Sequence, residues 1–346
     1  MRDNSSDKRY RLGGTQPKRG VRRTATVAAL ILAVAAFTTP GTASADDSDF
    51  TTFPLAFGSS PATIAKGPDG NLWFTELTGN AIGRISPDGR ITEFKAGLSA
   101  LSGPDRIVAG PDGNLWFTEW FGNRIGRITP DGAVTEFSAG ITPGASVFGI
   151  GAGADGNLWF TESTTNKVGR ITPGGVVTEF DGGPNASAAP TDIVAGADGN
   201  MWFTQRFGGI GRITPQGAVT VFTEGITPGA GSVSIASGPD GNLWFTETFA
   251  GRIGRISTAG VVDEFTQGLS PASLPVNITN GPDGKLWFTE YTGGRVGTVD
   301  TAGRVTEVRS VGETTVPDGI VTGPDGNLWF VQAVASRIGR LHPPTH

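Results

Sequence analysis

The stretch GPDGNLWFTE at residues 110–119 decides the fold, because the chain repeats it seven times with small variations. Its tryptophan recurs at steps of 43, 43, 43, 42, 43 and 42 residues, as Trp73, Trp116, Trp159, Trp202, Trp244, Trp287 and Trp329. A period near 43 with several short β-rich segments per repeat is typical of β-propellers with four strands to a blade. The sequence therefore predicts an all-β, seven-bladed β-propeller.

Each repeat supplies four short segments, which we assign to strands A to D. In the second repeat these are residues 106–109, 115–119, 124–128 and 134–137. Asp-Gly turns, which favour tight hairpins, join A to B and C to D. The repeated tryptophan is expected to pack between neighbouring blades.

The two ends of the repeat array predict how the ring closes. The seventh repeat stops after strand C, at residues 341–344, and lacks a strand D. The segment FTTF at residues 50–53 is similar to the other D strands and precedes the first strand A. An N-terminal strand that completes the last blade would remove exposed sheet edges. We therefore expect residues 46–346 to form a single propeller domain.

Residues 1–45 have the pattern of a signal peptide. Seven lysines and arginines from Lys8 to Arg23 precede an apolar stretch at 27–37, and Ala43-Ser44-Ala45 is a small-residue cleavage site. The Arg22-Arg23 pair raises the twin-arginine route beside the general one. The sequence predicts a secreted, extracellular protein without a membrane span; the alternative is a retained N-terminal anchor.

Composition narrows the partners of the mature chain. Removing the leader's eight Lys/Arg and two Asp/Glu from the 27 and 32 of the whole chain leaves 19 and 30, a net charge of about −11. This charge argues against nucleic acid and anionic membranes as partners. The chain has no cysteine, so disulfides and thiolate metal sites are excluded. We expect a monomer stabilised by packing.

Loop variation predicts the face that carries the site. The D-to-A connections differ from repeat to repeat and share a face with the B-to-C loops, whereas the short Asp-Gly turns lie on the other face. Variable loops on a rigid scaffold usually carry function. We therefore expect a small molecule, a cyclic peptide or a cell-envelope ligand to bind on this face, at the mouth of the central channel.

The residues at the start of strand A should line this mouth. Four of them have oxygen-bearing side chains of the kind that bind Mg²⁺ or Ca²⁺, namely Asp105, Asp192, Asn277 and Asp318. The alternative is that these side chains cap strand ends or bond to loop backbone. The predicted substrate-binding residues are Arg106 from strand A, and Trp120, Phe121 and Tyr291 from the B-to-C loops. No organic cofactor is expected.

Two further patterns bear on catalysis. Strand B ends in glutamate or glutamine in every repeat, as in Glu119, and strand C carries a repeated arginine, as in Arg127. A residue present in nearly every blade is more typical of the scaffold than of a catalytic site. We therefore expect the glutamate and the arginine to form a structural ion pair within each blade, an arrangement that can mimic an active site. The only histidines are His342 and His346, so a histidine triad or a histidine-ligated zinc is excluded inside the ring.

The quoted unit, followed by RIGRITPDG at residues 124–132 and VTEF at 134–137, resembles the repeat of virginiamycin B lyase, also called streptogramin lyase. The resemblance covers nearly all of residues 50–341. It implies a propeller that opens a cyclic depsipeptide antibiotic, a streptogramin B, at its ester by Mg²⁺-assisted elimination, and hence a role in antibiotic resistance.

The resemblance also places the family's catalytic positions on this sequence. The family's histidine at the start of the sixth strand A corresponds to Val276, and its Glu-Pro-His at the seventh corresponds to residues 316–318. Its metal-binding glutamate after the last Trp-Phe falls in the sequence Val-Gln-Ala at 331–333. Only Asp318 offers a base or a metal ligand. A solvated Asp318 near pKa 3.9 is a weak base at neutrality, so streptogramin turnover should be slow or absent.

Three functions follow as hypotheses. The first is a carbon–oxygen lyase with a rearranged metal and carboxylate site. The second is a metal-dependent lactone hydrolase, which propellers resembling gluconolactonase exemplify. The third is a non-catalytic extracellular binding propeller. The fold does not choose among them, because propellers host many unrelated functions.

Overall fold

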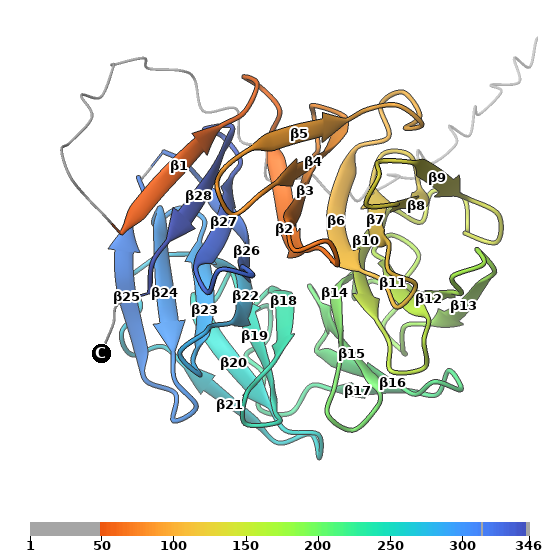
Figure 1. The fold of residues 1–346 in the computed structure, drawn as a ribbon. Coiled ribbons are helices and arrows are strands. Elements are labelled where there is room, and N and C mark those ends of the chain that lie inside the picture. Colours follow the sequence, from red (N-terminus) through yellow and green to blue (C-terminus); the bar gives the residue numbers. More distant parts are fainter. Residues whose placement is uncertain (1–48, 313, 344–346) are drawn as a thin grey trace, which may run out of the picture. The chain divides into compact units, whose positions relative to one another are not determined.

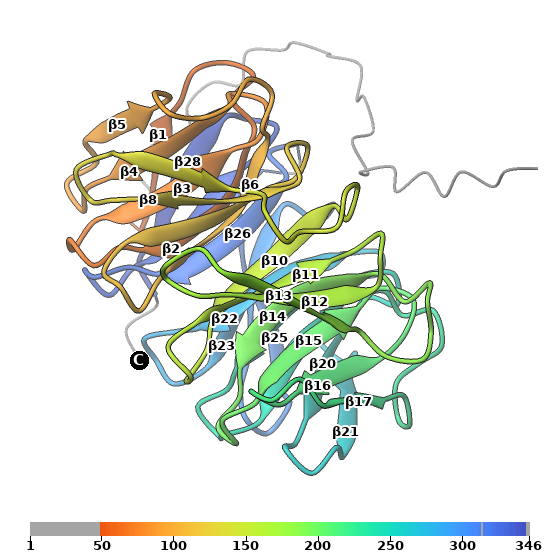
Figure 2. The ribbon, with the colours of Figure 1, turned by 90° about the vertical axis from the view of Figure 1, so that its right-hand side faces the viewer.

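The computed structural model describes residues 49–312 and 314–343, and every regular element in these ranges is a β-strand. The 28 strands of the described ranges form seven four-stranded antiparallel sheets. Figure 1 shows these sheets as blades around a centre, and Figure 2 shows one of them, β10 to β13, as a twisted sheet. No helix long and apolar enough to span a membrane occurs among the described residues. The predicted signal peptide, residues 1–45, lies outside them.

The strands of each blade follow the predicted order from the centre outward. The innermost A strands are β2 (Pro61–Lys66), β6 (Pro104–Ala109), β10 (Val147–Ala152), β14 (Pro190–Ala195), β18 (Ser232–Ser237), β22 (Pro275–Asn280) and β26 (Pro317–Thr322). The B strands are β3 (Leu72–Glu76), β7 (Leu115–Glu119), β11 (Leu158–Glu162), β15 (Met201–Gln205), β19 (Leu243–Glu247), β23 (Leu286–Glu290) and β27 (Leu328–Gln332).

The two outer positions complete the blades. The C strands are β4 (Ala81–Ile85), β8 (Arg124–Ile128), β12 (Lys167–Ile171), β16 (Ile210–Ile213), β20 (Arg252–Ile256), β24 (Arg295–Val299) and β28 (Arg337–Leu341). The D strands are β5 (Ile91–Phe94), β9 (Val134–Phe137), β13 (Val177–Asp181), β17 (Val219–Phe222), β21 (Val262–Phe265), β25 (Val305–Ser310) and, from the other end of the chain, β1 (Phe50–Pro54).

Strand β1 closes the ring, as the sequence predicts. It pairs antiparallel with β28, from Phe50 opposite Leu341 to Pro54 opposite Arg337, so the last blade contains both ends of the described chain (Figure 1). The innermost strand β2 contacts both β6 and β26, its neighbours on either side. Each blade therefore has two neighbouring blades, and no blade presents an unpaired face.

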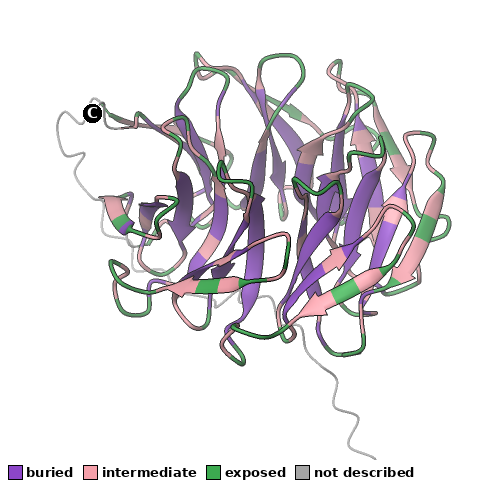
Figure 3. Cartoon of the chain, turned by 90° about the horizontal axis from the view of Figure 1, so that it is seen from below, coloured by how far each residue is buried: buried purple, intermediate pink, exposed green. Residues whose placement is uncertain are grey.

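The repeated tryptophans lie between blades, also as predicted. Trp116 is fully buried and packs with Leu158 and Phe160 of the following blade. Its ring stacks on Phe137 at 5.4 Å between centroids, and its indole N–H donates to Asp112 at 3.0 Å. Burial of one such side chain stabilises the fold by up to about 4–6 kcal/mol. Figure 3 shows the buried residues concentrated in the inner strands, with exposed residues in loops and outer strands.

The repeated arginine of strand C also joins blades, and the expected pairing with the glutamate of strand B is wrong. The guanidinium of Arg127 lies over the rings of Trp116 and Phe137 and donates to the carbonyl oxygen of Pro173 in the next blade, at 3.0 Å. The side chain of Arg127 lies at the end of the blade that carries the Asp-Gly turns. It is therefore directed away from the end of strand B, where the glutamate lies.

The strand-B glutamates are enclosed instead beside a second carboxylate. Glu119 is fully buried, and its nearest ion-pair partner is Arg124 at 3.8 Å. The second carboxylate, Glu136, accepts hydrogen bonds from the backbone N–H and the hydroxyl of Ser99 in the preceding D-to-A connection, both at 2.5 Å. Equivalent contacts join Glu179 to Thr142, Glu264 to Thr227 and Glu307 to Ser270. Each of these D-strand glutamates therefore binds a variable D-to-A connection to the blade that follows it.

Candidate functional site

On the face that carries the variable loops, each strand A starts with a β-bulge. Strand β6 starts at Pro104, two residues earlier than the sequence predicts, and the register with β7 shifts between Pro104 and Ile107. A bulge places extra residues on one strand and redirects their side chains. The hydroxyl of Thr118 holds it in place by accepting the backbone N–H of Arg106 at 3.0 Å.

The bulges surround a small cavity at the centre of the ring. It has a volume of about 120 Å³. The third residues of the A strands, such as Arg106 of β6, line it together with the repeated isoleucines of these strands. The polar lining residues are Thr63, Arg106, Asp192, Ser234 and Asn277. Two predicted metal ligands, Asp192 and Asn277, and one predicted substrate-binding residue, Arg106, therefore share one cavity.

A chain of hydrogen bonds crosses this cavity. Arg106, in the second blade, donates from Nη1 to Oδ1 of Asn277 in the sixth blade at 2.7 Å. Asn277 in turn donates from Nδ2 to Oδ1 of Asp318 in the seventh blade. The Arg106 side chain is only 9% exposed, and its guanidinium carbon lies 5.0 Å from the centre of the Phe148 ring. Residues far apart in sequence are thus tied together at the mouth.

The carboxylate of Asp192 is held separately. Its Oδ2 accepts from the Ser234 hydroxyl at 2.8 Å and from the backbone N–H of Ile235 at 3.2 Å. Its Oδ1 accepts from the backbone N–H of Ile193 at 3.0 Å. Asp192 therefore bonds to backbone groups at the strand start, which is the alternative role raised from the sequence.

Burial changes the titration of the other two aspartates. It raises the pKa of Asp105 to about 6; Arg106 opposes this rise, and Asp318 and Asp192 add to it. Burial also raises the pKa of Asp318, against the effects of Arg106 and the Asn277 hydrogen bond. The expectation of a solvated Asp318 near its ordinary pKa is therefore wrong. A carboxylate with a raised pKa is a stronger base.

The carboxylates act in turn on Arg106. Burial alone would lower the pKa of its guanidinium, but Asp105, Asp192 and Asp318 together raise it. Arg106 is therefore a permanent positive charge whose field reaches three carboxyl groups.

An aromatic rim lies above the cavity, at the ends of the B strands. Trp120 follows β7, stacks on Phe121 at 5.3 Å and meets the Phe148 ring edge-on at 6.1 Å. Phe121 is 56% exposed, and Phe207 and Phe249, at the same position of other repeats, are 58% and 54% exposed. These side chains place exposed apolar surface on the face of the mouth in three of the blades.

Tyr291 occupies the position of Trp120 in the sixth blade. Burial, and then the negative charge of Asp318, raise the pKa of its phenol. Tyr291 therefore lies near enough to Asp318 to be affected by its charge.

Arg206 is a site residue that the sequence reasoning missed. It follows Gln205, the last residue of β15, and so occupies the repeat position of Trp120 and Tyr291. Burial and the charge of Arg106 lower the pKa of Arg206, and its Nε is buried without a hydrogen-bond partner. Comparing this position across the seven repeats would have shown a charged residue where the other repeats place uncharged ones.

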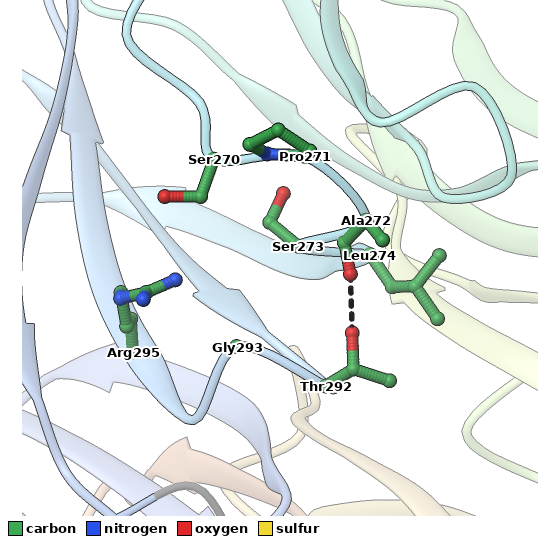
Figure 4. A pocket seen from close by; sticks show the side chains of 8 residues that line it. All are labelled: Ser270, Pro271, Ala272, Ser273, Leu274, Thr292, Gly293 and Arg295. Carbon is green, nitrogen blue, oxygen red and sulfur yellow. Dashed lines mark hydrogen bonds between the residues drawn. The ribbon is translucent and has the colours of Figure 1, made fainter.

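A second cavity lies on the same face, within the sixth blade. It measures about 480 Å³, and residues 270–274, Thr292, Gly293 and Arg295 line it. Figure 4 shows Thr292 beneath the 270–274 loop, where its hydroxyl donates to the carbonyl oxygen of Ala272 at 2.5 Å. None of the sequence-predicted site residues lines this cavity.

Comparisons with known proteins identify the family. The model of the virginiamycin B lyase family matches residues 48–270 and 266–345. The chain belongs to the virginiamycin B lyase family. The solved virginiamycin B lyase from Staphylococcus aureus is 34% identical, with 85% of this chain and 99% of that chain covered and a TM-score of 0.80.

Further similarities agree with this family. A catalytically inactive histidine-to-alanine variant of the S. aureus lyase, solved with quinupristin, is 34% identical over 85% of this chain and 99% of that chain, with a TM-score of 0.79. The curated virginiamycin B lyase from Bordetella pertussis is 61% identical over 31 residues, which are 9% of this chain and 10% of that protein. A gluconolactonase from Xanthomonas campestris, at 16% identity, 85% and 89% coverage and a TM-score of 0.55, shares the fold alone.

Two features of this mouth bear on the histidine and metal chemistry that the sequence resemblance implies. The described histidine, His342, follows β28 at the end of the strand away from the mouth, so it is not part of the site. Within residues 49–312 and 314–343, no group of three or more His, Asp or Glu is placed to hold a metal ion. Arg106 and protein donors already occupy the oxygens of Asn277 and Asp192. As arranged, the four predicted ligands do not fit a divalent ion.

Proposed function

We propose that this chain opens the ester of a cyclic depsipeptide or a related lactone at the channel mouth, by elimination, outside the cytoplasm. Family membership supports the reaction class. The observation that carries the proposal is Asp318, a carboxyl group whose pKa burial raises and which lies at the mouth beside Asn277 and Tyr291. Among the residues at the family's catalytic positions, Asp318 is the one that can accept a proton.

In this reaction Asp318 takes the proton from the carbon next to a carbonyl group. The electron pair left on that carbon forms a carbon–carbon double bond as the neighbouring carbon–oxygen bond of the ester breaks. The ester oxygen leaves as part of a carboxylate, so no water enters the product. Trp120 and Phe121 of the aromatic rim, together with Tyr291, would hold the apolar parts of the cyclic substrate during this step. Because a carboxylate replaces imidazole as the base, we expect slow turnover.

The product mass tests this proposal. Purified mature protein is incubated with a streptogramin B antibiotic, and the product is analysed by mass spectrometry. Elimination gives an open chain with the mass of the substrate, whereas hydrolysis adds one water. Asp318→Asn should abolish the elimination product. Asp131→Asn, in an exposed turn on the opposite face, is the matched control and should leave it unchanged. Turnover that survives Asp318→Asn would refute the assignment.

A non-catalytic binding propeller is the second candidate. The exposed aromatic side chains of Phe121, Phe207 and Phe249 favour it, because they offer contact area without chemistry. Under this reading a cyclic peptide or cell-envelope fragment would bind and be released unchanged. The lactone hydrolase is the third, and the mass gain of one water would identify it. Assistance by Mg²⁺ or Ca²⁺ stays a prediction that this arrangement of ligands does not favour.

A further inference from the structure

We infer that the Arg106 guanidinium is the resident cation of the channel mouth: it occupies the place among Asp105, Asp192, Asn277 and Asp318 that a divalent metal would need, and it offers its free donor to an oxygen atom of the ligand. The statement that Arg106 takes the place of a metal is independent of the proposed function. The statement that Arg106 binds an oxygen atom of the ligand rests on the proposed function.

The position of Arg106 supports the statement that it takes the place of a metal. Its side chain is 9% exposed and reaches from the second blade to Asn277 of the sixth, while the Phe148 ring packs against its guanidinium. The hydrogen bond to Asn277 and the Phe148 ring together hold the guanidinium against the central cavity. A side chain fixed in this way cannot move aside for an ion without breaking the hydrogen bond to Asn277.

The charges around Arg106 support it as well. Asp105, Asp192 and Asp318 all lie close enough to stabilise the positive charge of the guanidinium. Asp105 is buried, and Asp192 and Asp318 are half-buried. Carboxylates removed from solvent in this way require a nearby positive charge, because burying an uncompensated charge is strongly unfavourable. Arg106 supplies this charge permanently, and so it removes the electrostatic demand that a metal would otherwise satisfy.

Protein donors already occupy oxygen atoms that a metal shell would need. Mg²⁺ and Ca²⁺ take at least six oxygen ligands, several of them from the protein or from water. Oδ1 of Asn277 accepts from Arg106, and Oδ1 of Asp318 accepts from Asn277. Oδ1 of Asp192 accepts from the backbone N–H of Ile193 in the same strand, and its Oδ2 accepts from the Ser234 hydroxyl of the next blade. Three of the four predicted ligands thus already accept hydrogen bonds from protein groups.

The donors that remain unused point to the ligand chemistry. Nε of Arg106 and Nε of Arg206 are both buried without a hydrogen-bond partner, and the two guanidinium groups lie close enough to interact electrostatically. Buried donors of this kind are normally satisfied by an acceptor. An ester or amide carbonyl oxygen, which gains negative charge when a proton leaves the adjacent carbon, is such an acceptor.

Terbium luminescence tests the metal part without any substrate. Tb³⁺ binds where Ca²⁺ binds and is sensitised by nearby tryptophan, here Trp120. Each protein is compared with its Asp318→Asn counterpart, so that only binding that depends on Asp318 is scored. We expect no such signal in the native protein. Arg106→Gln, which keeps an amide donor but removes the charge, should bind Tb³⁺ at least about tenfold more tightly than the native protein, and Ca²⁺ should displace it.

Arg106→Lys is the matched control, because it keeps a positive charge at the same place and should gain no Tb³⁺ binding. Melting curves establish that each variant is folded. If Arg106→Gln does not fold, Arg106→Met, which preserves the apolar stem, replaces it. An Asp318-dependent Tb³⁺ signal in the native protein would overturn the inference. So would a folded Arg106→Gln or Arg106→Met protein that gains no such signal.

A second measurement addresses the ligand part. If the native protein shows turnover, EDTA should leave its rate unchanged, whereas Arg106→Lys should lower kcat more than it raises KM, because the loss concerns an oxygen that becomes negative during the reaction. Inhibition by EDTA would contradict the inference while leaving the proposed reaction intact. Absence of turnover would contradict the proposed reaction and leave the Tb³⁺ result unaffected.

Discussion

The buried glutamates at the ends of the B strands should make this propeller lose stability as the pH rises above neutrality. Glu119 is fully buried, and burial first, then the charge of Glu136, raise its pKa from 4.5 to about 8 against the opposing effect of Arg124. Glu136 shows the opposite shift. Burial alone would raise its pKa, but the hydrogen bonds from Ser99 lead the effects that lower it. At neutral pH the pair therefore holds one proton, on Glu119.

The sign of the effect follows from these two shifts. The pKa of Glu119 is higher in the folded state, so its contribution to stability is complete below pH 4.5 and is lost as the pH rises through about 8. One pKa unit corresponds to about 1.4 kcal/mol, so full ionisation of Glu119 would lower the free energy of unfolding by up to about 5 kcal/mol. Entry of water would reduce this figure, and we expect about 1–3 kcal/mol for one blade.

Glu119→Gln is the decisive variant, because the chain already places glutamine at this position in two blades. Gln205 donates to the carbonyl oxygen of Gly182 at 2.7 Å, and Gln332 donates to that of Val311 at 3.0 Å. The variant should match the native protein at pH 5 and should melt several degrees higher at pH 9. Thermal unfolding followed by circular dichroism at a series of pH values measures this difference.

The control for this experiment is Glu224→Gln, which removes the same charge from an exposed loop position. It should leave the slope of melting temperature against pH unchanged. If the curves of the native protein and of Glu119→Gln run parallel from pH 5 to pH 9, the buried carboxyl group does not titrate as described, and the reasoning fails.

Three other predictions concern closure, export and catalysis. Deletion of residues 46–55 removes β1, leaves β28 without its partner and should lower the melting temperature sharply; an unchanged value would contradict closure by β1. N-terminal sequencing of protein from the culture medium should find Asp46 first, whereas an intact Met1 in the cytosol would contradict export. Asp318→Ala should lower any ring-opening rate by about 10²–10⁴-fold, the usual contribution of a general base, and a rate within a few-fold of native would show that another group is the base.

The fold was predictable because each blade repeats the same packing unit. Trp116, the Asp-Gly turns and the missing last strand D were all visible in the sequence, and each depends on local or nearest-blade contacts. The start of strand A was placed two residues late, because a bulge depends on register, which the sequence pattern does not specify.

The site was predictable in its location but not in its contacts. Asp105, Asp192, Asn277 and Asp318 were identified because the repeats differ there, and the structure brings three of them around Arg106 through electrostatic contact and Asn277 through a hydrogen bond. Which oxygen meets which donor depends on distances across the ring, between residues 171 positions apart. The same reason explains why burial of Asp318 was missed. Sequence position says nothing about the solvent that the opposite blades exclude.

The bulge at the start of each strand A has a consequence for how such proteins diversify. Backbone contacts and a threonine from strand B, such as Thr118, hold it, and the bulge residues Asp105 and Arg106 contribute nothing to the apolar clusters between blades. Mutations there change no member of those apolar clusters. Two such residues in each of the seven blades give a set of positions around the channel mouth that can vary in many combinations. Members of the family can therefore exchange histidines for aspartates and arginines in a few mutational steps, and gain or lose a chemistry without first having to become more stable.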